Sequence, residues 1–251
     1  MAVFTGSFLS SALGRHTSVS LILPHDTKPE PSGGYPVLYL LHGFTDDSRS
    51  WLYRSNIERY ATERGLFVVM PDAETSFYAD MVCGSNYFTY ITAELPAFLR
   101  DVYRTSVNRA KNFVAGVSMG GYGALKCALL KPEQYAGCIA LSPVADISWA
   151  VASSTSLGSP NIWKGILGET MRLTRDVDLF RILSTGGGYA SMCPRIYVAC
   201  GKNDELFDQN IRLKDALDAN RIEHTFEQAN AGHEWGFWDV ALQRGMDMII
   251  R

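Results

Sequence analysis

The chain of 251 residues lacks the features that mark membrane-spanning, secreted or nucleic-acid-binding proteins. No stretch approaches the roughly 18 consecutive apolar residues that a membrane-spanning helix needs. Residues 1–7 contain no basic residue and no unbroken apolar run, so we expect no signal peptide. The net charge is only −3 and Lys and Arg form no cluster, which argues against nucleic acid or an anionic membrane as a partner. We therefore expect a cytoplasmic protein.

Paired thiols, repeats and domain linkers are also missing. None of the five cysteines belongs to a C-x-x-C pair, and their positions in predicted strands and helices are typical of buried, reduced thiols. No internal repeat and no linker interrupts the chain. With 47% apolar residues the chain can bury a sizeable core, so we expect a single domain over residues 1–251.

Apolar runs of strand length alternate with segments of helical spacing. The strands are expected at residues 36–41, 66–70, 112–117, 135–141, 195–200 and 223–228, and the helices at 50–64, 90–103 with a kink at Pro96, after 118, 211–219 and 238–249. Residues 1–24 alternate like two strands joined at 9–14, whereas 26–34 and 73–86 read as loops. This alternation predicts a mostly parallel sheet with helices on both faces. Residues 144–190 break the pattern and are expected to form a lid or cap.

The sequence Gly116-Val117-Ser118-Met119-Gly120 lies between one predicted strand and the following helix. A G-x-S-x-G motif in this context makes a sharp turn that lifts the serine hydroxyl out of the backbone as a nucleophile. The helix that follows also directs its free N–H groups and its positive dipole end toward this point. We therefore predict that Ser118 is a catalytic nucleophile.

A serine hydroxyl needs a base to activate it, and His233 is the predicted base. It stands in a loop after the last strand, where a doubly wound sheet places residues that face a ligand. His16 and His25 belong to the N-terminal antiparallel region, and His224 lies within a predicted strand. The order Ser…Asp…His also requires a late histidine.

The acid that orients the base should follow a strand between these two residues. Asp204, in Gly201-Lys202-Asn203-Asp204 after the strand at 195–200, is the favoured candidate, and Asp146 is the topological rival. Glu205 and Asp208 fit ordinary carboxylates at a helix start. The backbone N–H groups of Met119 and Phe44 are the expected oxyanion hole, whereas His42 is expected to shape the loop around Phe44 through local hydrogen bonds.

Large aromatic residues surround these candidates in the sequence. The side chains expected to bind substrate are Phe77, Tyr78, Trp149, Trp163 and Trp235. Bulky rings close to the nucleophile leave a small apolar acyl pocket. We therefore expect the site to accept only a small acyl group, with a leaving-group side that accepts flat aromatic groups.

Five motifs occur together in the chain. They are Leu40-Leu41-His42-Gly43, Ser76-Phe77-Tyr78, Glu94-Leu95-Pro96, the run from Gly116 through Ser118-Met119-Gly120-Gly121-Tyr122-Gly123 to Leu125, and Ala231-Gly232-His233. Together they resemble the esterase D group of α/β-hydrolases, which includes tributyrin-type esterases, S-formylglutathione hydrolases, feruloyl esterases and mycolyltransferases. The resemblance runs from about residue 37 to 233, is weak across 144–190, and is nearest to bacterial short-chain acyl esterases.

This resemblance implies the α/β-hydrolase fold, ester hydrolysis through an acyl-enzyme, no cofactor or metal, and frequent homo-oligomers. Together with the small acyl pocket, it predicts acetyl to butyryl esters as substrates. A thioesterase acting on S-formylglutathione and a feruloyl or acetyl-xylan type esterase share the same machinery. The S-formylglutathione hydrolases tend to carry Gly-His-Ser where this chain has Gly-Val-Ser. An acyltransferase would need an acceptor site that no motif indicates, and a non-catalytic binding protein would not need three triad candidates.

Overall fold

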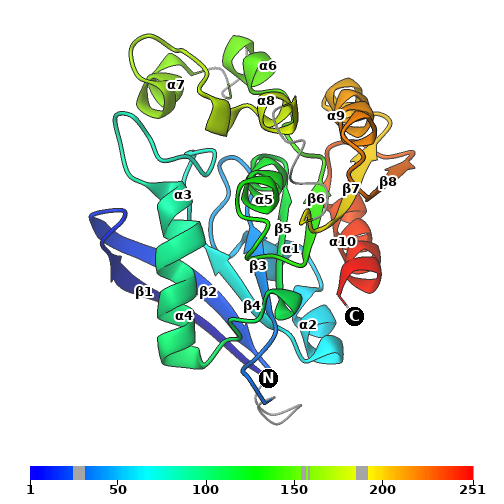
Figure 1. The fold of residues 1–251 in the computed structure, drawn as a ribbon. Coiled ribbons are helices and arrows are strands. Elements are labelled where there is room, and N and C mark those ends of the chain that lie inside the picture. Colours follow the sequence, from blue (N-terminus) through cyan, green and yellow to red (C-terminus); the bar gives the residue numbers. More distant parts are fainter. Residues whose placement is uncertain (25–31, 154–156, 158, 185–191, 251) are drawn as a thin grey trace.

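The computed structural model describes residues 1–24, 32–153, 157, 159–184 and 192–250. Its centre is an eight-stranded sheet with the order β1-β2-β4-β3-β5-β6-β7-β8 (Figure 1). The strands are β1 Ala2–Ser10, β2 Arg15–Leu23, β3 Val37–Leu41, β4 Phe67–Pro71, β5 Asn112–Val117, β6 Gly137–Leu141, β7 Arg195–Gly201 and β8 His224–Ala229. β2 is antiparallel to β1 and to β4, and the other neighbours are parallel. The expected mostly parallel sheet is confirmed.

Helices cover both faces of the sheet. One face carries α1 Ser50–Arg54, α2 Ile57–Arg64 and α10 Trp235–Ile249, and the other carries α4 Leu95–Tyr103, α5 Met119–Leu130 and α9 Phe207–Ala219. The short elements α3 Tyr87–Thr89 and the π-helical turn η1 Tyr90–Glu94 precede α4, and the 3₁₀ turn η2 Arg109–Lys111 precedes β5. Residues 144–184 contribute α6 Ile147–Ala152, α7 Pro160–Leu167, the 3₁₀ turn η4 Arg175–Val177 and α8 Leu179–Ser184, which gather at the top of Figure 1.

Two of the expected helices are divided into shorter elements in the structure, and those expected at 211–219 and 238–249 begin earlier, at Phe207 and Trp235. The expected helix 50–64 is broken at Ser55 and Asn56, because the backbone and side-chain amides of Asn56 both donate to the Asp239 carboxylate on α10, at 2.8 and 2.6 Å. The expected kink at Pro96 takes the form of the π-helical turn immediately before α4. Of the five cysteines, Cys83 and Cys193 lie outside strands and helices, whereas the other three are buried as expected.

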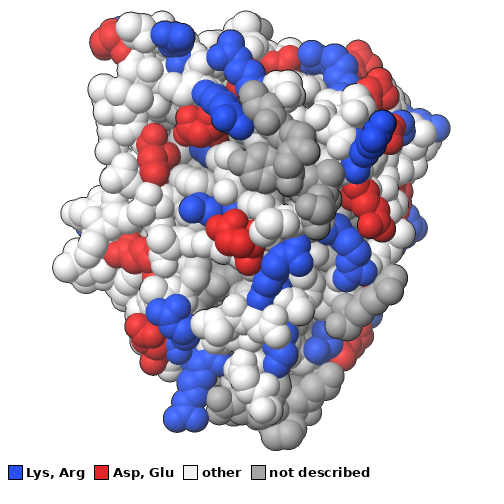
Figure 2. All heavy atoms as spheres, in the orientation of Figure 1, with Lys and Arg blue, Asp and Glu red and all other residues white. Residues whose placement is uncertain are grey.

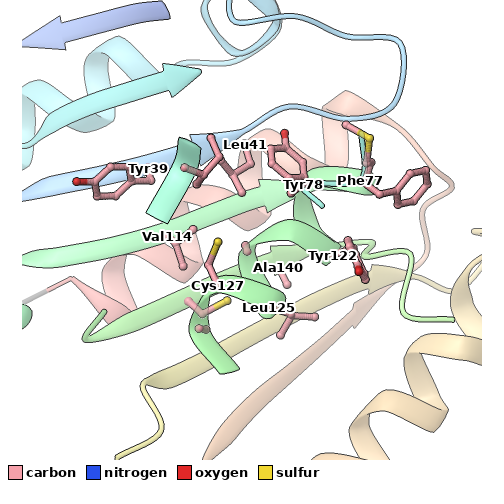
Figure 3. Packing of buried hydrophobic residues seen from close by; sticks show 14 of the residues in the cluster. Tyr39, Leu41, Phe77, Tyr78, Val114, Tyr122, Leu125, Cys127 and Ala140 are labelled. Carbon is pink, nitrogen blue, oxygen red and sulfur yellow. The ribbon is translucent and has the colours of Figure 1, made fainter. Parts of the chain in front are cut away.

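The core lies on both sides of the sheet, and its larger cluster supports the motif around Ser118. Figure 3 shows Leu125 and Cys127 of α5 packed over Val114 and Ala140 of the sheet. All eleven residues of α5 from Met119 to Leu129 are buried. A helix that is buried on every side cannot shift without disturbing the whole core. The nucleophile candidate therefore stands on a rigid element.

The surface agrees with the low net charge. On the face shown in Figure 2, positive and negative side chains are interspersed and form no large patch of one sign. Among the described residues, no helix is long and apolar enough to cross a membrane. The same part of the chain contains no group of three or more His, Cys, Asp or Glu residues that could hold a metal ion. His25, the first part of the expected loop 26–34, and portions of the expected lid segment lie outside the described residues.

Candidate active site

Ser118 occupies the turn between β5 and α5 in a backbone conformation that only the surrounding packing can maintain. Its φ and ψ are 55° and −116°, outside the regions that residues other than glycine prefer. The backbone N–H of Ser118 donates to the Leu141 carbonyl at 2.8 Å. A Cβ at Gly116 would lie 2.2 Å from the Gly120 carbonyl oxygen, and one at Gly120 would lie 2.3 Å from the Leu41 carbonyl oxygen. The two glycines of the motif are therefore required by close backbone approach.

The structure brings Ser118, His233 and Asp204 together. His233 lies between β8 and α10, and its Nε2 is 3.1 Å from Ser118 Oγ. Its Nδ1 is 2.8 Å from Asp204 Oδ2. A carboxylate only accepts, so Nδ1–H donates to Asp204 and leaves Nε2 free to accept the serine proton. This is the arrangement of a serine hydrolase triad.

Asp204 follows β7 and its side chain is fully buried. Burial opposes its ionisation, but hydrogen bonds from His233, the Leu206 N–H and Ser142 outweigh this, so the pKa of Asp204 lies below its ordinary value of 3.8. The carboxylate therefore stays charged at neutral pH. Its rival Asp146 lies elsewhere, accepting from the Trp149 N–H at 3.1 Å and from Arg212 at 2.8 Å.

Two residues near the triad were not identified from the sequence. Trp238 of α10 donates its indole N–H to Ser142 Oγ at 3.0 Å, and Ser142 is one of the groups that lower the pKa of Asp204. The Trp238 ring also meets the His233 ring edge-on, with centroids 4.7 Å apart. In the sequence, Ser142 marks only the end of a strand and Trp238 only the start of a helix. Their role depends on contacts across 96 residues of chain.

His42 shapes the loop after β3, as expected. Its Nδ1–H donates to the Gly43 carbonyl at 2.7 Å, and its Nε2 accepts the Ala73 N–H at 2.9 Å. The His42 carbonyl accepts the Tyr78 hydroxyl at 2.8 Å. These bonds require a neutral imidazole. Burial favours that form by lowering the pKa of His42 below its ordinary value.

The backbone N–H groups of Phe44 and Met119 are the candidates to bind an oxyanion. Within the described part of the chain, neither the Phe44 N–H nor the Met119 N–H has a hydrogen-bond acceptor. Met119 opens α5, so its N–H also lies at the positive end of the helix dipole. Both groups are the ones that the sequence motif predicts.

A cavity of about 470 Å³ opens over Ser118 and His233. It is also lined by Gly43, Phe44, Thr45, Asp46, Arg54, Val117, Leu157, Glu205, Trp235 and Trp238. Of the residues expected to bind substrate, only Trp235 borders it. Arg54, Leu157 and Trp238 were not expected there.

Phe77, Tyr78, Trp149 and Trp163 do not reach the wall of this cavity. Phe77 and Trp163 are each 1% exposed, with ring centroids 4.7 Å apart, and Phe77 packs behind Phe44 at 6.0 Å. Tyr78 is held under the loop of His42, and Trp149 belongs to the partly buried surface of α6. Phe77 and Trp163 therefore pack behind Phe44, and none of the four aromatic side chains lines the cavity.

Comparisons with known proteins agree with this geometry. A family model described as "Putative esterase" matches residues 10–248. An acetyl esterase of Caldicellulosiruptor saccharolyticus is 31% identical over 264 residues, covering 100% of this chain and 99% of that protein. The solved structure of FphF, a fluorophosphonate-binding serine hydrolase of Staphylococcus aureus, is 28% identical with a TM-score of 0.91, covering 100% of this chain and 98% of that one. An S-formylglutathione hydrolase (FrmB) of the same organism is 29% identical with a TM-score of 0.87, covering 100% and 99% of the two chains.

The family match spans nearly the whole chain, and the relatives are covered over almost their full length. The sheet and its flanking helices are those of the α/β-hydrolase fold shared by these neighbours. The chain therefore belongs to the esterase family that the model describes, and it is a serine hydrolase that acts on carboxylic esters.

Proposed function

We propose that this enzyme hydrolyses esters of short acyl chains, acetyl to butyryl, with Ser118 as nucleophile, His233 as general base and acid, and Asp204 as the orienting carboxylate. The observation that carries these roles is the unbroken hydrogen-bonded chain from Ser118 Oγ to His233 and on to the buried Asp204. The acetyl esterase relative supports the substrate class.

The reaction follows from this geometry in two halves. Ser118 Oγ attacks the ester carbonyl carbon while its proton passes to His233 Nε2, and the carbonyl oxygen becomes an oxyanion. The Phe44 and Met119 N–H groups donate to that oxyanion. His233 then gives the proton to the leaving alcohol oxygen, which leaves an acyl group on Ser118. Water repeats the sequence to release the acid and restore the serine.

The short acyl preference rests on the packing behind Phe44. Phe44 faces the cavity, and the buried rings of Phe77 and Trp163 fill the volume behind it. A long chain would have to displace these packed rings, which costs more than the roughly 1–3 kcal/mol gained for each fitting methylene. Turnover should therefore fall sharply beyond butyryl.

A thioester substrate is the second candidate. The solved S-formylglutathione hydrolase is 29% identical along the whole chain, and the same triad would cleave a thioester. Oxygen ester and thioester differ here only in the leaving group that accepts the proton from His233. Relative rates on matched acetyl esters and thioesters therefore separate the two candidates.

The experiment is a series of p-nitrophenyl esters from acetyl to decanoyl, run beside S-formylglutathione. We expect the highest kcat/KM at acetyl to butyryl, and loss of at least about 10⁴-fold in Ser118→Ala. Asp204→Asn should lose on the order of 10⁴-fold in kcat, whereas Asp146→Asn, the matched control, should retain activity. A preference for decanoyl esters, or a crippled Asp146→Asn, would contradict the proposal.

The rest of this proposal concerns cofactors, oligomeric state and cellular location. The steps above need neither a metal ion nor a cofactor. Self-association into a homo-oligomer and a cytoplasmic location stay predictions from the sequence. Sedimentation of the purified protein and fractionation of its source cells test them.

A further inference from the structure

Arg54 stands in the cavity that holds the nucleophile, and nothing in the triad chemistry requires a cation there. It is the last residue of α1, and its guanidinium lies over the Trp235 ring with 5.6 Å between the carbon and the ring centroid. Trp235 is itself fixed by edge-on contacts with Trp51 and Trp238, at 4.9 and 5.4 Å. The aromatic support under Arg54 is therefore rigid.

The guanidinium of Arg54 lacks a hydrogen-bonding partner in the described part of the chain. Many other arginines are paired with carboxylates: Arg15 with Glu74, Arg49 with Asp47, Arg64 with Asp247, Arg212 with Asp146 and Arg244 with Glu227. Arg54 instead borders the cavity without such a carboxylate partner among the described residues. A stacked guanidinium with free donors suits a carboxylate, which it can bind through two parallel hydrogen bonds.

The position of Arg54 identifies the part of the substrate that it would meet. His233 Nε2 gives its proton to the leaving alcohol, so that group must lie on the His233 side of the cavity. The Trp235 ring contacts the Trp238 ring, which in turn meets the His233 ring, whereas the proposed oxyanion donors are the backbone N–H groups of Phe44 and Met119. Arg54, above Trp235, therefore borders the leaving-group side and not the acyl side.

Other charges border the same cavity. Asp46 follows the oxyanion loop and Glu205 follows Asp204, and both carboxylates would repel an anion that approached them. An anionic leaving group is favoured only where its charge lies closer to Arg54 than to Asp46 or Glu205. A leaving group whose carboxylate lies next to the Arg54 guanidinium meets this condition.

We propose that Arg54, supported by Trp235, selects esters whose leaving group carries a carboxylate. This inference rests on the proposed function, because it assigns the alcohol side of the same site. The shared chemistry could come from a carboxylated alcohol or from a carboxylated thiol.

The test compares two acetyl esters in wild type and in Arg54→Gln: 4-acetoxybenzoate, which is anionic, and phenyl acetate, which is neutral. Intrinsic reactivity of each ester is the same with both enzymes, so the ratio of kcat/KM values isolates Arg54. We expect the anionic-to-neutral ratio to fall roughly three- to tenfold in Arg54→Gln, mainly through the KM of the anionic ester. High salt should reduce the wild-type ratio as well, since an exposed ion pair is screened.

Two variants serve as controls. Arg59→Gln removes an exposed arginine of α2 that does not border the cavity, so the ratio should stay unchanged. Glu205→Gln removes a carboxylate from the cavity wall, so the ratio should rise. The same comparison with the S-acetyl derivatives of 3-mercaptopropionate and of its amide shows whether a thiol leaving group obeys the same rule.

A ratio that is equal in wild type and Arg54→Gln, or that falls as much in Arg59→Gln, overturns the assignment of Arg54. Good turnover of phenyl acetate in that case leaves the proposed esterase function standing. Failure of wild type on both esters would instead count against the proposed function itself.

Discussion

At the scale of single residues, catalytic geometry and conformational strain meet at Ser118. The residue combines a φ of 55° with a ψ of −116°, and the packing of the neighbouring strand and helix holds it in this conformation. Such conformations cost about 1–3 kcal/mol and persist only where the surrounding packing enforces them. The turn that exposes Oγ to His233 is thus held at the expense of stability.

Replacing Ser118 with glycine should therefore produce a more stable protein than replacing it with alanine. Glycine adopts this backbone conformation without strain, and its greater entropy in the unfolded chain offsets only part of the gain. We expect Ser118→Gly to exceed Ser118→Ala by about 1 kcal/mol in the free energy of unfolding, measured by denaturant titration. Both variants should lack activity, so the comparison is independent of catalysis. Equal stability of the two would mean that the turn stores no strain.

At the scale of elements, the sequence predicted most of what depends on local pattern. The buried strands and the turn at Ser118 are encoded by apolar runs and glycines that lie next to each other in the chain. The break between α1 and α2 is not encoded locally, because it depends on Asp239, which lies 183 residues away from Asn56 in the chain. Periodicity alone continues the helix through that point.

The site shows the same division. Chain order and local context together selected Ser118, Asp204 and His233, which the structure brings together. Order alone admits Asp146 as well, and the glycine turn before Asp204 decided between the two. The sequence did not show which aromatic rings would face the cavity and which would face the core. Phe77 and Trp163 face the core and each other, whereas Arg54, a polar residue at a helix end, reaches the cavity. Which side chains border a cavity depends on the packing of several elements at once, and no local pattern records it.

Gly123 shows how two elements constrain each other near the site. A Cβ at this position of α5 would lie 2.4 Å from the Tyr78 ring, and Tyr78 holds the His42 carbonyl through its hydroxyl. Gly123→Ala should therefore lower the free energy of unfolding by roughly 1–3 kcal/mol, since a crowded core must shift. Gly236→Ala is the matched control in α10, because a Cβ there meets nothing within 4 Å. Gly236→Ala should leave the free energy of unfolding unchanged or raise it by up to about 1 kcal/mol. Equal free energies of unfolding for the two variants, measured by thermal or chemical unfolding, would mean that the close approach of Gly123 to Tyr78 does not constrain stability.

At the scale of the whole molecule, lowering the pH should reduce the free energy of unfolding already at pH values well above those at which carboxylates titrate. His42 is 1% exposed, and burial holds its pKa below the ordinary value of 6.5 despite the Gly43 carbonyl and the Asp72 carboxylate nearby. The unfolded chain therefore binds a proton near pH 6.5 that the folded chain does not, so the free energy of unfolding falls as pH drops below about 6.5, by up to ~1.4 kcal/mol per pH unit. The contribution of Asp204 is lost only at lower pH, because its pKa lies below 3.8 in the folded state.

Urea titrations between pH 7 and 5 measure how the free energy of unfolding changes with pH in the range assigned to His42. His42→Gln should flatten it, whereas His16→Gln, at an exposed position of β2, should leave it unchanged. An undiminished slope in His42→Gln would place the responsible proton elsewhere in the fold.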